Sequence, residues 1–316
     1  MLLQRSLFCA VFLFGLVNMA MARHTSPSAN YSTTYTNGIN ESGWQSNSTV
    51  FECSLVHDVP YYGTAVFRTR AGESSVFYLN ALSSRFQAGE AQLVARSPIW
   101  RGKSSVDLGD VPIKRGHRPM WLPSRNAERM LNELFKGMEI EIVKDAWYED
   151  VKNPPARLSI SNIGFRKEYQ KYQLCLAGLL PQNFDQMRRT ALYFEPNVPE
   201  SSDDLNPQIV RKLDNILKLV KHDNSIRLFY VDGHTSSPGD RAYNLELSKR
   251  RAELVRDYLT RRGIPADWIK LRWHGERYPV ASNATAAGRA KNRRVTIRLE
   301  RVEDIDVLPL ASQTNN

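Results

Sequence analysis

The second half of the chain constrains the fold most, because apolar runs of strand length alternate there with segments of helical period. Residues 207–222 and 245–262 carry apolar side chains three and four positions apart, which is the spacing of an amphipathic helix. Strands are predicted at residues 191–194, 226–231, 268–273 and 295–299. This order predicts an α/β sandwich, in which two main helices pack on one mixed sheet.

The first half has a different pattern, with short strands separated by Gly and Ser turns. Polar and apolar residues alternate at 139–142 and 157–160, as in strands with one buried face. Further strands are predicted at residues 64–68, 76–80 and 91–95, and helices from about Ser124 and over 166–179. This half therefore predicts a mostly antiparallel β domain with flanking helices, which places the chain in the α+β class.

The first 22 residues have the pattern of a secretory signal peptide. Arg5 is followed by an apolar run over 7–17 and by the small-residue signal Ala20-Met21-Ala22. The run is too short for a membrane span, which needs roughly 20 residues. No cysteine stands directly after the cleavage point, which argues against a lipid anchor. We expect cleavage after Ala22, export to the periplasm and no membrane span in the mature chain.

The rest of the chain divides by composition. Residues 23–48 are rich in Ser, Thr and Asn without an apolar period, which predicts a flexible leader. A boundary near Pro181 separates the β domain, over 49–182, from a second domain over 183–303. Residues 304–316 are expected to form a flexible tail.

The mature chain holds two cysteines, Cys53 and Cys175. An even number in an exported protein favours a disulfide, and two buried thiols are the alternative. The bridge would join the start of the β domain to its closing helix. The net charge of +10 suits an anionic cell wall or an acidic protein surface, and export argues against nucleic acid as the partner.

A candidate binding site follows the strand at 226–231. The loop between Gly233 and Gly239 leads into a helix, and backbone N–H groups at such a place favour an anionic group. Asn244, Leu247 and Arg251 stand at i, i+3 and i+7, so they line one side of that helix. Arg251 can hold a carboxylate by two parallel hydrogen bonds. We expect a shallow cleft that binds a zwitterion, with the ammonium on an acidic partner.

The motifs of this half resemble those of OmpA-type domains. They run Val-Asp-Gly-His-Thr at 231–235, Asn-Leu-Glu-Leu-Ser-Lys-Arg-Arg-Ala at 244–252, Gly-Arg at 288–289 and Asn-Arg-Arg-Val at 292–295. The resemblance implies binding of the diaminopimelate in the peptide stem of peptidoglycan. Together with the helical spacing, it makes Asp232, Thr235, Ser236, Asn244, Leu247, Arg251 and Arg294 the candidate site residues.

One position departs from that pattern. The family normally has an Asp after Gly-His-Thr to receive the ammonium, and this chain has Ser236. Asp232 or Asp240 is the candidate replacement, and we expect weaker binding than in a typical member. Of Arg293 and Arg294 one is expected to border the cleft, and pairing with nearby carboxylates is the alternative. His234 is interpreted as a structural residue, and neither a metal site nor a cofactor is expected.

The first half resembles MotY-like flagellar motor proteins. The agreement lies at 52–60, 63–67 and 98–101, at Trp147 and in the helix of Cys175. The resemblance implies a non-enzymatic structural protein of a periplasmic basal-body ring, the T ring. That ring would contain a MotX-like partner and help to recruit or stabilise stator units, while the second domain anchors to peptidoglycan.

Two other functions are alternatives. One is a general peptidoglycan-binding envelope protein that is not tied to motility. The other is a wall hydrolase that uses Asp232, His234 and a nearby serine, for which no serine is well placed.

Overall fold

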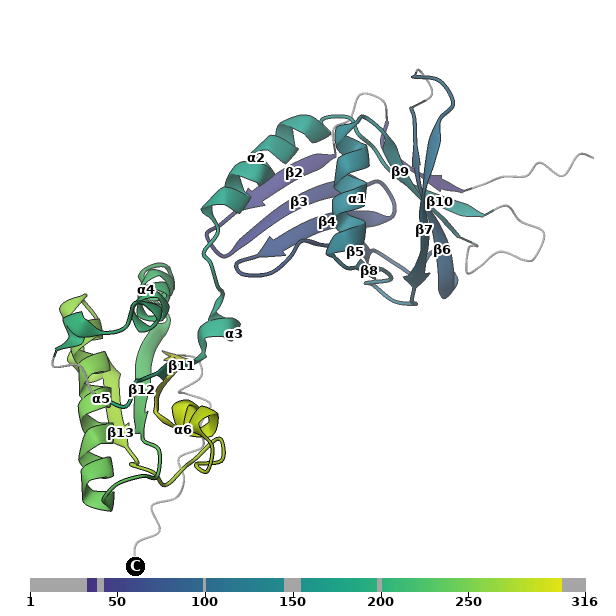
Figure 1. Cartoon of the computed structure of the whole chain (residues 1–316). Helices are drawn as coiled ribbons and strands as arrows, with labels where there is room; N and C mark the ends of the chain where they lie inside the picture. Colours follow the sequence, from purple (N-terminus) through teal and green to yellow (C-terminus); the bar gives the residue numbers. More distant parts are fainter. Residues whose placement is uncertain (1–32, 39–42, 99–100, 145–154, 198–200, 303–316) are drawn as a thin grey trace, which may run out of the picture.

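The computed structural model describes residues 33–38, 43–98, 101–144, 155–197 and 201–302. The predicted signal peptide at 1–22, the predicted tail at 304–316 and Trp147 lie outside these residues. Figure 1 shows two bodies joined by a short segment that contains α3 (Phe184–Met187). Among the described residues, no helix combines the length and the apolar character that crossing a membrane requires.

The N-terminal body contains two five-stranded sheets. The first has the order β2-β3-β4-β5-β8, with strands Trp44–Ser48, Glu52–Val59, Gly63–Arg70, Val76–Ala81 and Trp121–Leu122. The second has the order β1-β10-β9-β6-β7, with strands Thr34–Tyr35, Ala156–Ile160, Glu139–Lys144, Gly89–Arg96 and Ser105–Ile113. Neighbouring strands are antiparallel except for β1 and β10. The predicted mostly antiparallel β domain is confirmed.

Two helices complete this body. α1 (Ser124–Phe135) buries Met130, Leu131 and Leu134 on one face, while Phe135 at its end is exposed. α2 (Phe165–Gly178) lies along β2 and β3, and its Tyr172 hydroxyl is 2.7 Å from Thr69 Oγ1 (Figure 1). The core between helices and sheets is aromatic, with Phe165 edge-on to Trp44 at a ring distance of 5.0 Å.

The predicted flexible leader is wrong for the described part of residues 23–48. β2 pairs with β3, and β1 pairs with β10. Trp44 is buried, and its Nε1 donates to the carbonyl of Ser161 at 2.7 Å. The segment has the polar composition of a loop and no apolar alternation, and β1 pairs with a strand more than 100 residues away, so no pattern within the segment reveals the two strands.

A disulfide joins Cys53 of β3 to Cys175 of α2, with the Cα atoms 5.9 Å apart. The predicted bridge is therefore confirmed. It connects the first long strand of the body to the last turn of its closing helix.

The C-terminal body has one four-stranded sheet of order β11-β14-β12-β13. Its strands are Arg189–Tyr193, Arg294–Arg301, Ile226–His234 and Ile269–Trp273. β12 and β13 are parallel and the other pairs are antiparallel, so the predicted mixed sheet is confirmed. The helices are α4 (Pro207–His222), α5 (Arg241–Arg261) and α6 (Ala286–Asn292), with short 3-10 turns η2 (Ser202–Asp204) and η3 (Ala266–Trp268).

Local signals explain the two long helices. Asn206 caps α4 by accepting from the Gln208 N–H, and Pro207 occupies the first helical position. α5 begins four positions before the predicted start, because the Asp240 carboxylate accepts from the backbone N–H of Ala242 and of Tyr243. Both helices pack their apolar sides on the face of the sheet that carries Phe229 and Val231.

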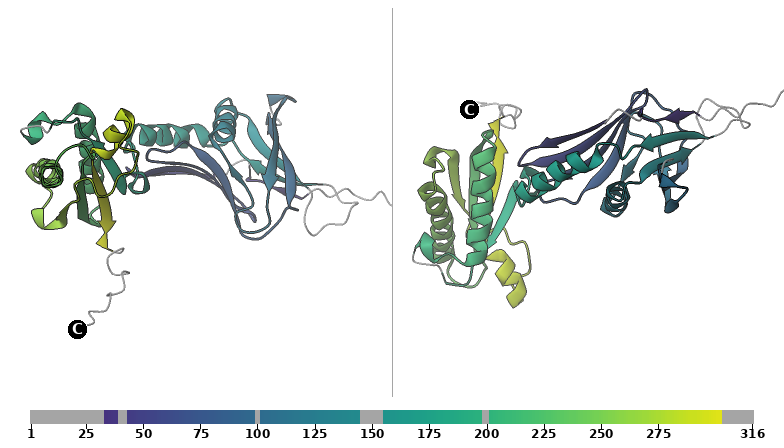
Figure 2. Two further views of the ribbon diagram at one scale, coloured as in Figure 1. Left: turned by 60° about the horizontal axis from the view of Figure 1, so that its bottom comes forward. Right: turned by 90° about the horizontal axis from the view of Figure 1, so that it is seen from above.

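The segment between the bodies is held to the N-terminal body. The Leu180 N–H donates to the carbonyl of Val50 at 2.9 Å, and Asn183 Nδ2 donates to the carbonyl of Ala71 at 3.0 Å. Asn183 also caps α3 (Phe184–Met187). The end of α2 points toward this segment in both views of Figure 2. The connection is therefore a packed junction.

Candidate functional site

Four chain segments meet at one end of the C-terminal sheet. The strand register places Tyr193, Arg294 and His234 side by side, at the end of β11, the start of β14 and the end of β12. The Thr235 N–H donates to the carbonyl of Gly275 at 2.9 Å, which adds the loop after β13. The N-terminal half of α5 lies over this end. The Gly233–Gly239 loop that the sequence singled out is part of it.

Gly233 lets α5 approach the sheet closely. A Cβ atom at this position would collide with the carbonyl of Ser248. The Ser248 hydroxyl in turn accepts from the Gly275 N–H at 3.0 Å. The two contacts fix the helix against the ends of β12 and β13, and they set the position of Arg251 one turn further on.

Arg251 is a buried cation with unused donors. Its side chain is 0 % exposed, and Nη2 donates to the carbonyls of Glu195 and Pro196 at 2.8 and 3.0 Å. Nε and Nη1 have no partner. Burial, together with the nearby Arg293, lowers the pKa of Arg251 to about 10, so the group stays charged at neutral pH. Buried polar groups are normally hydrogen-bonded, so this cation lacks an acceptor that an anion could provide.

Two further polar atoms beside this loop are buried without a partner, Thr235 Oγ1 and His234 Nδ1. Burial is the main cause that lowers the pKa of His234 to about 4, with Arg294 and His274 adding to it. His234 therefore remains a neutral imidazole, whose ring stacks on His274 at a centroid distance of 5.0 Å. Ser236 is only half-buried. Thr235 and the unpaired nitrogen atoms of Arg251 lie at the end of the sheet where the sequence predicted an anion site, whereas the His234 side chain faces away from α5 because side chains alternate along β12.

Asn244 and Leu247 have other surroundings than Arg251. Asn244 is buried, and its Nδ2 donates to Glu276 Oε2 at 2.6 Å. It therefore holds the loop after β13 in place. Leu247 is half-buried. The helix does carry the three residues, but Asn244 is already engaged within the protein.

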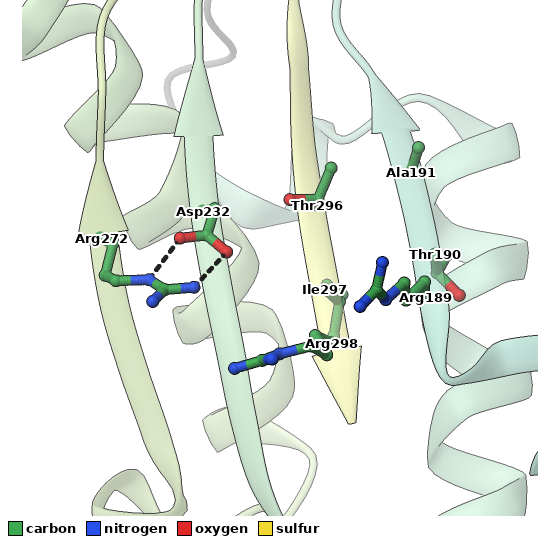
Figure 3. Close-up of a pocket in the computed structure, with 8 residues that line it drawn as sticks. All are labelled: Arg189, Thr190, Ala191, Asp232, Arg272, Thr296, Ile297 and Arg298. Atoms are coloured by element: carbon green, nitrogen blue, oxygen red, sulfur yellow. Dashed lines mark hydrogen bonds and ion pairs between the residues drawn. The ribbon is translucent and has the colours of Figure 1, made fainter. Parts of the chain in front are cut away.

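Asp232 lies on the opposite face of the sheet from α5, because side chains alternate along β12. Its carboxylate accepts from Arg272 Nε at 2.5 Å and Nη2 at 2.9 Å (Figure 3). It is also 3.1 Å from His274 Nε2. Burial raises the pKa of Asp232, but the hydrogen bonds from Arg272 and His274 outweigh burial and leave the pKa below its usual value. The structure thus does not bring Asp232 and Arg251 together.

Asp240, the other candidate for the ammonium, is exposed and caps α5. Two other acidic residues stand at this end of the sheet. Glu195 is exposed, and its backbone carbonyl accepts from Arg251. Glu276 is half-buried beside Asn244. Glu195 follows the first predicted strand of the domain directly, so the predicted topology was the signal that could have found it.

Of the two adjacent arginines, Arg293 is the one close to Arg251. Its Nε donates to the carbonyl of Phe194 at 3.1 Å, and its charge helps to lower the pKa of Arg251. Arg294 instead donates to the carbonyls of Tyr278 and Asn292 at 3.1 and 3.4 Å. The two side chains point to opposite faces of the sheet. The structure therefore places Arg293, and not Arg294, beside Arg251.

Within the described residues, no three His, Cys, Asp or Glu side chains gather as a metal site would require.

Comparisons with known proteins cover both bodies. Residues 35–181 match the family described as "MotY N-terminal domain", and residues 193–293 match the "OmpA family". The sodium-type flagellar protein MotY of Vibrio parahaemolyticus is 30% identical over 259 residues, which are 81% of this chain and 86% of that protein.

The C-terminal body has further relatives. The outer-membrane lipoprotein YfiB of Pseudomonas aeruginosa is 43% identical over 97 residues, which are 30% of this chain and 56% of that protein. The peptidoglycan-binding protein ArfA of Mycobacterium bovis is 48% identical over 67 residues, 21% of each chain. Because the similarity to the Vibrio protein extends over both bodies and most of either chain, the chain belongs to the MotY family.

Proposed function

We propose that this protein is a non-enzymatic structural component of the flagellar motor, and that it anchors a periplasmic basal-body ring to peptidoglycan. Its place in the MotY family supports the motor role. The observation that carries wall binding is the buried Arg251 guanidinium, whose Nε and Nη1 have no acceptor. These donors lie in the domain that matches the OmpA family, whose relatives include a peptidoglycan-binding protein.

The ligand is the free end of diaminopimelate in the stem peptide, which carries a carboxylate and an ammonium. The carboxylate would accept from Arg251, and the Thr235 hydroxyl could add a further hydrogen bond. Since Arg251 is fully buried, the ligand reaches it only when Glu195 and Pro196 shift. The ammonium would then meet the carboxylate of Glu195 or Glu276. Ser236 contributes a neutral hydrogen bond, about half as strong as one to a carboxylate.

Sedimentation with purified sacculi tests the site. The mature protein should pellet with sacculi, and Arg251→Ala should abolish pelleting. Arg251→Met fills a similar space without the charge and should also abolish pelleting. This result would show that the lost charge, and not a packing defect, is the cause. Arg250→Ala, on the exposed side of the same helix, is the matched control and should pellet normally. Normal pelleting of Arg251→Ala would refute the assignment.

A second set of variants locates the ammonium. Ser236→Asp should strengthen pelleting, because it restores a carboxylate next to Thr235. A different outcome is that Ser236→Asp leaves pelleting unchanged while one of the variants Glu195→Gln and Glu276→Gln weakens it. In that case the ammonium binds the glutamate whose replacement weakens pelleting. If none of the three has an effect, this half of the site is wrong.

The N-terminal body would dock on the basal body, together with a MotX-like partner and the stator units. Deletion of the gene should therefore abolish or reduce swimming, and the Arg251→Ala protein should restore it only in part. Unimpaired swimming of the deletion strain would instead favour a general envelope protein. Incubation with sacculi should release no muropeptides, since Asp232 is engaged by Arg272 and leaves no relay to His234.

A further inference from the structure

The face of the C-terminal sheet that α4 and α5 leave uncovered carries a cationic hollow of about 420 Å³ (Figure 3). It is lined by Arg189, Thr190, Ala191, Asp232, Arg272, Thr296, Ile297 and Arg298. Arg251 approaches the sheet from the opposite side, so the hollow is separate from the proposed wall site.

The strand register arranges the cations of this face in a row. Lys270 is paired with Tyr230, Tyr230 with Arg298, and Arg298 with Arg189, so that the row crosses all four strands. Neighbouring strands lie about 4.8 Å apart, so the row is roughly 14 Å long. Arg272 stands two residues further along β13, on the same face, and adds a fourth cation.

These cations are held in place and are only partly neutralised. The Tyr230 ring lies between the guanidinium groups of Arg298 and Arg272, at 4.3 and 4.9 Å from its centroid. Arg272 is paired with Asp232, and Arg298 has Glu300 at 3.4 Å. Within the described part of the chain, no carboxylate lies within ion-pair distance of Arg189 or Lys270. The face therefore has a net positive charge, which favours the binding of an anionic partner.

The length of the row decides between kinds of anion. A single phosphate cannot reach cations that are spread over about 14 Å. An extended polypeptide presents every second side chain on one side, about 6.8 Å apart, so three such carboxylates span the same length as the row. Arginine pairs well with carboxylates. An exposed row of cations also selects for acidic partners and raises the rate of association with them.

We infer that this sheet face, made of Arg189, Lys270, Arg272 and Arg298, binds an extended acidic segment of a partner protein. The segment carries a carboxylate on every second residue. Because Arg251 lies behind the sheet, the protein can hold this partner and the wall at the same time.

The test uses the full mature chain and a labelled eight-residue peptide of alternating Glu and Thr. Fluorescence anisotropy at low salt should show binding, which a Gln–Thr peptide of the same length lacks. Arg189→Gln combined with Arg298→Gln should weaken binding by about tenfold, since each exposed pair contributes modestly. The matched control, Arg211→Gln with Lys218→Gln on α4, removes the same charge from the helical side and should bind within about twofold of the native chain.

Several results would overturn the inference. Absence of peptide binding, or an equal loss in both double variants, would reduce it to nonspecific attraction. Displacement of the peptide by inorganic phosphate at equal concentration would mark an ordinary anion site. Removal of residues 303–316, which contain Glu303, Asp304 and Asp306, should leave the affinity unchanged; a large gain would make the chain's own end the occupant. The double variant should still pellet with sacculi, which keeps this result independent of wall binding.

Discussion

The two bodies of the protein bury different chemistry. The largest fully buried side chains of the N-terminal body are aromatic, among them Tyr62, Phe67, Phe77 and Phe165. In the C-terminal body the largest is Arg251, a cation with two unpaired nitrogen atoms. An aromatic core stabilises a scaffold by itself, whereas an uncompensated buried charge is costly unless a ligand completes it. The contrast indicates that the N-terminal body is a rigid scaffold and that the C-terminal body holds the ligand-binding site.

The disulfide should give the largest effect, and it should act on one body only. Replacing Cys53 and Cys175 by Ala opens a loop with a sequence separation of 122 residues. In the chain-entropy model this lowers the free energy of unfolding by about 4–5 kcal/mol. Hydrogen exchange followed by mass spectrometry should show lost protection in the N-terminal body and native protection in the C-terminal one. Equal losses in both would mean that the bodies unfold as a unit.

Acid should reveal a buried histidine in each body. Burial lowers the pKa of His57 from 6.5 to about 4, and His234 shifts to a similar value. Each unfolded histidine takes up a proton below its unfolded pKa of 6.5, while the folded one stays neutral. Stability is therefore complete above that pH and falls as the pH drops toward 4, by roughly 3 kcal/mol for each histidine at the most.

His57→Phe separates the two contributions. It should remove the dependence of stability on pH in the N-terminal body between pH 7 and 5, and leave that of the C-terminal body unchanged. The measurement is the free energy of unfolding at both pH values, with hydrogen exchange to assign it to a body. An unchanged slope in the N-terminal body would contradict the lowered pKa of His57.

The junction should give the smallest effect. Asn183 Nδ2 donates to Ala71 and, at 2.8 Å, to Glu73, while its Oδ1 caps α3. Asn183→Ala should cost about 1–2 kcal/mol and loosen the connection without unfolding either body. Limited proteolysis should then cut near Pro181, and it should leave the native chain intact there. Unchanged resistance would show that the junction does not depend on this residue.

Much of the fold could be predicted from local signals. α4 has its cap, its Pro and its apolar stripe in one continuous segment, so its predicted range of 207–222 is confirmed. β2 could not be predicted, because Trp44 is its one buried residue and its hydrogen bonds go to β3. β7 (Ser105–Ile113) was missed as well, because its first three residues are exposed and Gly109 interrupts it beside an irregular pairing with β6.

The candidate site was predicted in part. Helical spacing was enough to single out Arg251 and Asn244, since both stand on one continuous helix. The side on which Asp232 and Arg294 lie depends on strand parity, and that parity follows only from the register of β12 and β14. The nearness of Glu195 and Arg293 to Arg251 depends on the meeting of four chain segments. Such contacts follow from the assembled sheet and have no signature in any short segment.

The bridge at Cys175 has a consequence for the proposed role in the motor. In that role, movement of the basal body against the cell wall would pull on the chain between the two bodies. Without the bridge, a pull on the chain after Leu180 would unfold α2 turn by turn, starting from its C-terminal turn. Because Cys175 stands in that turn, the load passes directly into β3, which is hydrogen-bonded on both sides, by β2 and by β4. The disulfide thus protects the end of α2 from unfolding at the point where the connecting segment joins the N-terminal body.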